Sequence, residues 1–215
     1  MKRSFSGPQT MTASHLRLLI CTTFLAVAGP VWATSVIPPS FDQLVNRSDY
    51  VIHGRVAEVE SRWMKANKQM AIFTFVTFEV LETVSGEHPE TVKLQLLGGT
   101  VEGEEMVIQG APTFEVGQEY MVFVEGNGTQ FFPLVAMMYG SYPIKKDAAT
   151  GQKLVMRSNG QILRSTEAVS EPMDRHETDP SRTEGKAKTI PLTLEQFKSR
   201  IRTVEPEGKR DAQLD

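Results

Sequence analysis

Only one histidine of this sequence could act in catalysis from a fixed position. Three of the four histidines follow residue 33: His88 precedes a proline in a predicted turn, and His176 lies in a polar stretch. His53 lies in a predicted strand, where Glu79 or Asp49 could orient it as a general base. No cysteine and no serine motif accompanies it. We therefore favour an ordinary strand histidine and keep a hydrolase that uses His53 as an alternative.

Two further stretches resemble ligand sites only superficially. The run from Gly98 to Gly103 lacks the lysine of a phosphate loop, and no helical pattern follows it, so we interpret its glycines as turn residues. Glu102, Glu104 and Glu105 could hold a hard cation, but they lack a regular ligand spacing. We expect a solvated loop, no metal site and no cofactor.

The best candidates for a binding surface are apolar. Trp63, Met64 and Met70 flank the turn between the two longest predicted strands. If exposed, they would form a contact patch, whereas burial would make them ordinary core residues. A glycine-containing loop further along the chain is the second part of the candidate surface, through Gly98, Gly99, Gly110, Pro112 and Phe114.

The first 33 residues have the pattern of a secretory signal peptide. Basic residues come first, an apolar run covers residues 18–28, Gly29-Pro30 ends it, and Ala33 fits a cleavage site. The run is shorter than the roughly 20 residues of a membrane span, although an uncleaved anchor is the alternative. Translation could also start at Met11. We expect export to the periplasm or the medium.

Composition limits the class of the exported part. The only cysteine is Cys21, so cleavage after residue 33 of 215 would leave 182 residues without a cysteine, which favours a bacterial source. The net charge is −3, and because the first 33 residues hold three basic and no acidic residues, the remainder carries about −6. This balance argues against nucleic-acid binding. No second long apolar run predicts a membrane span.

Predicted strands dominate the exported part. Residues 71–84 are rich in β-branched and aromatic residues, and their length predicts a strand that curves across two faces. Gly54 predicts a bulge or bend in residues 50–60. Other strands are expected in residues 91–97, 106–109, 119–124, 130–133, 137–144 and 153–156.

Two short helices frame the strands. Ser40 is the expected N-cap of residues 41–46, and Thr193 with Gln196 forms a capping box before a helix that places Leu194, Phe197 and Ile201 on one face. We expect a signal peptide in 1–33, an OB-like antiparallel barrel in 34–164, a disordered linker in 165–190, a C-terminal helix in 191–204 and a disordered tail in 205–215. A two-sheet sandwich is the alternative fold.

Three stretches resemble a family of exported bacterial proteins of unassigned function. They read "FDQLVNRSDYVIHGRVAEVESRW", "FEVLETVSG" and "LLGGTVEGEEMVIQGAPTFEVGQEYMVFV". The resemblance covers residues 40–144 and is carried by Gly54, Gly98, Gly99, Gly110, Pro112, Phe114 and Gly117. A weaker similarity to netrin-like and metalloproteinase-inhibitor domains implies an OB-fold barrel. Those inhibitors chelate zinc through an amino-terminal cysteine, and this chain offers none after cleavage.

These observations favour a non-enzymatic binding module with a protein partner, for which a secreted protease is a candidate. OB-like barrels bind through one sheet face and its loops, which selects the hairpin near Trp63 and the loop from Gly98 to Pro112. The hydrolase that uses His53 and a structural component of the cell envelope are the two alternatives.

Overall fold

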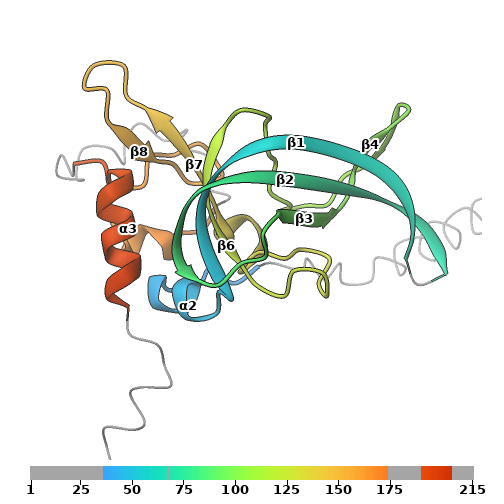
Figure 1. Ribbon diagram of the computed structural model, residues 1–215, viewed down its shortest axis with the longest axis horizontal. Helices are drawn as coiled ribbons and strands as arrows, with labels where there is room; N and C mark the ends of the chain where they lie inside the picture. The colour runs from blue at the N-terminus through green and yellow to red at the C-terminus, as the bar shows by residue number, and fades with distance from the viewer. Residues whose placement is uncertain (1–35, 67, 174–189, 205–215) are drawn as a thin grey trace, which may run out of the picture. The chain divides into compact units, whose positions relative to one another are not determined.

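The computed structural model describes residues 36–66, 68–173 and 190–204 (Figure 1). The expected signal peptide, most of the expected linker and the expected tail lie outside these residues. The helices and strands are α2 (Phe41–Asn46), β1 (Tyr50–Ala66), β2 (Gln69–Gly86), β3 (Val92–Leu97), β4 (Gly99–Val101), β5 (Glu104–Met106), β6 (Glu119–Val124), η2 (Met137–Gly140), β7 (Ser141–Lys146), β8 (Lys153–Val155), η3 (Glu167–Ser170) and α3 (Leu194–Thr203).

The described part is mainly β, as expected, and it holds two α-helices. Six strands form one antiparallel sheet in the order β3-β2-β1-β6-β7-β8, and β4 and β5 form a separate hairpin. The sheet ends at β3 and β8, which are not paired with each other, so it is not closed and the OB-like barrel is not confirmed. The six strands also lie in one sheet rather than in the two of a sandwich.

The hairpin of β1 and β2 is strongly curved (Figure 1). The β1–β2 register shifts at three places, one of them between His53 and Gly54, which confirms the predicted bulge. A Cβ at Gly54 would lie 3.1 Å from Phe78 Cδ1 and 3.2 Å from the Glu79 carbonyl oxygen. Because Gly54 has no side chain, β2 can pass close to the backbone of β1 at this position. Beyond the last register shift, between Val56 and Glu58, residues 58–66 of β1 and 69–77 of β2 form what we call the distal hairpin.

Both faces of the sheet are buried around β6. Tyr120, Val122 and Val124 belong to one apolar cluster, whereas Met121 and Phe123 belong to the other. Because side chains alternate between the faces of a strand, this pattern requires a cover on each side. One cluster extends over β1, β2 and β3, and the other extends to α2, α3 and β8.

The C-terminal helix forms as predicted and packs on the cluster that contains Met121 and Phe123. Thr193 and Gln196 form a reciprocal capping box, and Leu194, Phe197 and Ile201 are all buried. The helix thereby shields one face of β6 and β7 from water.

The expected linker boundary at residue 165 requires correction. Residues 167–170 form η3, and Val169 is fully buried in the same cluster as Leu194. The polar composition of the whole stretch indicates disorder, but one buried valine is enough to fix residues 167–170 against the core. The core therefore extends past residue 164 and includes η3 and α3.

The N-terminal helix is held by a capping box that the sequence analysis only half anticipated. The Ser40 side chain accepts from the Gln43 amide, and the Gln43 side chain accepts from the Ser40 amide. Leu44 and Val45 are buried, and the ring of Phe41 lies 5.7 Å from that of Phe197. The helix α2 therefore contacts α3 within the cluster that contains Met121 and Phe123.

Candidate functional site

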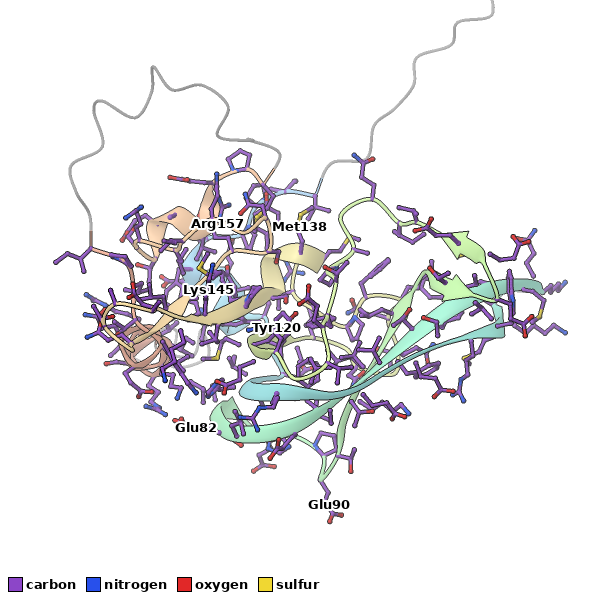
Figure 2. All side chains as sticks on the ribbon, turned by 90° about the horizontal axis from the view of Figure 1, so that it is seen from above. Glu82, Glu90, Tyr120, Met138, Lys145 and Arg157 are labelled. Carbon is purple, nitrogen blue, oxygen red and sulfur yellow. The ribbon has the colours of Figure 1, made fainter. Side chains whose placement is uncertain are left out.

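A groove lies between the distal hairpin and the segment from residue 98 to 114, and its volume of about 440 Å³ falls within the roughly 300–1,000 Å³ of ligand sites. We call the hairpin face that borders it the inner face. Figure 2 shows the β4–β5 hairpin beside the distal end of β1 and β2. The groove is lined by Val59, Ser61, Thr74, Val76, Leu96, Leu97, Gly98, Gly99, Thr100, Glu105, Met106, Val107, Ile108, Ala111, Pro112, Thr113 and Phe114.

Gly98 and Gly99 anchor the β4–β5 hairpin to the inner face. The Ser61 and Thr74 hydroxyl oxygens are 2.8 Å apart, and Thr74 donates to the Gly98 carbonyl oxygen at 2.7 Å. A Cβ at Gly99, whose φ is +132°, would lie 2.2 Å from Thr74 Oγ1. Only glycine lets the backbone approach this pair of hydroxyls so closely. These glycines therefore shape the groove rather than offer it a side chain.

The loop that closes the other side of the groove is fixed by an aromatic cluster. The Phe114 ring is half-buried and lies edge-on to Phe78 and Tyr120, at centroid distances of 5.6 and 4.9 Å. Pro112 is buried, and a Cβ at Gly110 would lie 2.8 Å from Met138 Cε. Gly98, Gly99, Pro112 and Phe114 thus line the groove as a group, whereas Gly110 lies next to Met138.

The tip of the distal hairpin exposes apolar side chains. Trp63 and Met70 are 42% and 58% exposed, and Met64 is half-buried. Trp63 lies opposite Ile72, so Trp63, Ile72 and Met70 share the inner face, whereas Met64 lies on the other face. Trp63 and Met70 therefore extend the apolar lining of the groove towards the tip.

A second cavity of about 320 Å³ lies behind the loop that carries Phe114. Tyr120 and Met138, both labelled in Figure 2, line it together with Ser158 and Asn159. The Tyr120 hydroxyl accepts from the Glu115 amide at 3.1 Å. The sequence analysis did not anticipate this cavity, because its lining comes from four separate stretches of the chain.

The acidic partner of His53 is neither of the two that we expected. His53 Nε2 lies 2.9 Å from Glu119 Oε2. Glu79 instead accepts from Arg55 at 3.1 Å, and Asp49 accepts from the Gly126 amide at 2.7 Å. Glu119 is 66 residues away from His53 in the chain, and only the pairing of β1 with β6 brings the two together.

Electrostatics favours a structural role for this pair. Burial opposes ionisation of Glu119, but hydrogen bonds from Lys153, His53 and Arg55 outweigh it and lower the pKa of Glu119 to about 2. Burial lowers the pKa of His53, and the positive charges of Lys198 and Lys153 add to that effect. His53 is then uncharged at neutral pH and donates its Nε2 proton to the carboxylate. It is 5% exposed and lines neither of the cavities described above.

A second ionic cluster ties α3 to the sheet. The buried ammonium group of Lys198 donates to Glu82 on β2 at 2.5 Å and to Glu195 at 3.0 Å, and Arg202 also binds Glu82. The hydrogen bond from Lys198 is the largest cause of the lowered pKa of Glu82. This cluster fixes the helix and offers no open site.

The described residues hold no group of three or more histidine, aspartate, glutamate or cysteine side chains placed to bind a metal ion. None of the helices in that part of the chain has the length and apolar character to cross a membrane.

Comparison with known proteins adds no assignment. No protein-family model matches the chain, and no curated protein matches it either.

Proposed function

We propose that the chain is an exported, non-enzymatic binding module whose partner is a protein, with a secreted protease as the candidate target. The observation that carries the proposal is the exposure of Trp63 and Met70 beside an apolar groove. Tryptophan is enriched among the residues that dominate protein–protein binding energy, and exposed apolar patches mark contact surfaces.

The elements that line the groove are consistent with binding of a protein partner. Its floor belongs to the sheet, and its walls are the β4–β5 hairpin and the loop to Phe114. Val107, which is 76% exposed, adds an apolar residue at the rim. OB-like domains also bind through one sheet face and the adjoining loops. We therefore include in this proposal that the fold is related to OB-like domains. The basic and apolar pattern of residues 1–33 supports export.

Affinity capture with matched variants tests the proposal. The tagged protein is incubated with periplasmic extract and culture medium of the producing organism, and bound proteins are identified by mass spectrometry. The test variant carries Trp63→Ser and Met70→Ser. The control carries Leu81→Ser, which removes an exposed apolar side chain on β2 outside the distal hairpin.

The expected result is one secreted protein that is enriched with the wild type and the control. Its enrichment should be at least about tenfold lower with the double variant, because truncating a hot-spot tryptophan costs about 2 kcal/mol or more. If the partner is a protease, its activity is then assayed with and without the wild type. Equal capture by the double variant, or no enriched protein, would count against the proposal.

A further inference from the structure

The distal part of β1 has an open edge. β6 pairs with β1 only as far as Arg55, after which Val56 donates to the Gln118 carbonyl oxygen and accepts from the Gly117 amide. From Glu58 to Ala66, β2 is the only strand that pairs with β1 among the described residues. An open edge of this length is a template for another strand.

The hydrogen bonds of the neighbouring strands show which residues face this edge. Gly98 donates to the Ile72 carbonyl oxygen, so the peptide groups of Ile72 and Thr74 point towards β3. Those of Phe73 and Phe75 then point towards β1, where they meet their register partners Arg62 and Glu60. Peptide groups alternate along a strand, so those of Val59, Ser61 and Trp63 point outwards.

The charges along this edge match those of a second, antiparallel copy of the same edge. Glu60 and Arg62 are exposed and lie on the face opposite to the groove. In an antiparallel pair of two identical strands centred on Ser61, Glu60 of each copy lies opposite Arg62 of the other. Centring on Glu60 or on Arg62 places like charges opposite each other, and centring on Val59 places Glu58 opposite Glu60.

We propose that two copies of this chain pair antiparallel along β1, with Ser61 on the two-fold axis. The pairing joins the two sheets into one and forms two Glu60–Arg62 pairs on one face. On the inner face it places Val59 of each copy opposite Trp63 of the other, an apolar cross-strand pair. A two-fold interface uses the same patch on both copies, which a self-complementary pattern satisfies.

The charge pattern is what selects a second copy as the occupant. Proteins protect open edges with charges that repel another edge. Here both signs alternate with the spacing that a two-fold pair needs, so the edge attracts its own copy. This inference goes beyond the proposed function, because its occupant is a second copy of the chain. The charge pairs lie on the face opposite to the groove, and only the Val59–Trp63 pairs involve residues on the inner face.

A charge-swap experiment tests the pairing. The full chain is expressed in a bacterial host and purified, and its mass in solution is measured by analytical ultracentrifugation across a concentration series. Glu60→Arg and Arg62→Glu each turn both cross-strand pairs into like-charge pairs, so each should raise the dimer Kd at least about tenfold. The double variant E60R/R62E restores opposite charges and should recover the dimer.

The double variant also separates this interface from a folding defect. Arg62 lies 4.2 Å from the centroid of the Phe75 ring, so its replacement alone can lower stability, and thermal melts accompany each measurement. A monomeric wild type at every concentration would overturn the pairing. So would a double variant that stays as monomeric as the two single variants while its melting temperature matches the wild type. Both readouts use the purified chain alone, so they do not require a captured partner protein.

Discussion

At the scale of single residues, the position of β4 over the groove depends on Gly99. Replacement by alanine would place a methyl group against Thr74 Oγ1 and Ser61 Oγ, at 2.2 and 2.6 Å, while φ is +132°. We expect Gly99→Ala to lower the free energy of unfolding by about 1–3 kcal/mol, the usual cost of overpacking. Urea denaturation measures the change.

Gly103 offers the matched control for this substitution. It also has a positive φ, of +88°, but nothing lies within 4 Å of the position of its Cβ. Gly103→Ala therefore carries the backbone strain without the steric contact. Equal losses in the two variants would show that the hydroxyl pair does not hold β4 in place.

Single residues also show where sequence reasoning ended. Gly54 could be placed at a bulge because a glycine inside a strand weakens it and commonly marks a bulge or a close backbone approach. The partner of His53 could not be found, because Glu119 becomes adjacent only through a strand pairing across 66 residues. The carboxylates proposed from proximity in sequence, Asp49 and Glu79, accept from different donors.

At the scale of elements, one aromatic ring of α3, that of Phe197, contacts both α2 and the sheet. The Phe197 ring lies within 6 Å of the rings of Phe41, Phe123 and Tyr142, which belong to α2, β6 and β7. We expect Phe197→Ala to lower the free energy of unfolding by about 3–5 kcal/mol, as is usual for buried phenylalanine. Equilibrium denaturation followed by circular dichroism measures it.

A surface phenylalanine provides the comparison for this prediction. Phe131 is 47% exposed, so Phe131→Ala removes a ring of the same size from a much less buried site. Its cost should be well below that of Phe197→Ala. Similar losses from the two variants would contradict the role of α3 as part of the core.

Elements with a local signal were predicted well, and those set by distant contacts were not. Both α-helices begin at a side-chain cap that can be read from a few neighbouring residues. The hairpin of β4 and β5 was interpreted as a glycine-rich turn before a strand at residues 106–109, because glycine has low strand propensity. Its position follows from Ser61 and Thr74, which lie on other strands.

At the scale of the whole described part, the cover on both faces of β6 places a charged residue at the edge of the core. Because both faces of β6 are covered, its first residue, Glu119, lies at the boundary between a core and water. Its carboxylate there receives hydrogen bonds from β1 and β8, through His53, Arg55 and Lys153. The Glu119 cluster thus connects three strands of the sheet, and stability should depend on its protonation.

Lowering the pH should destabilise the fold in two steps. Burial holds the pKa of His53 below its usual 6.5, so the unfolded chain takes up that proton first and stability falls as the pH drops below about 6.5. The pKa of Glu119 is lowered from 4.5 to about 2, so its contribution is present above pH 4.5 and is lost between these values. A shift of this size corresponds to roughly 3 kcal/mol.

Urea denaturation from pH 8 to pH 3 measures both steps, and Glu119→Gln identifies the second. The variant removes the ionisable group, so it should be less stable at pH 7 and show a shallower loss below pH 4.5. Glu79→Gln is the control, because that carboxylate is 58% exposed and surface ion pairs contribute at most about 1 kcal/mol. An unchanged acid slope in Glu119→Gln would mean that other carboxylates cause the acid sensitivity, and the Glu119 cluster would then not be the link between the strands.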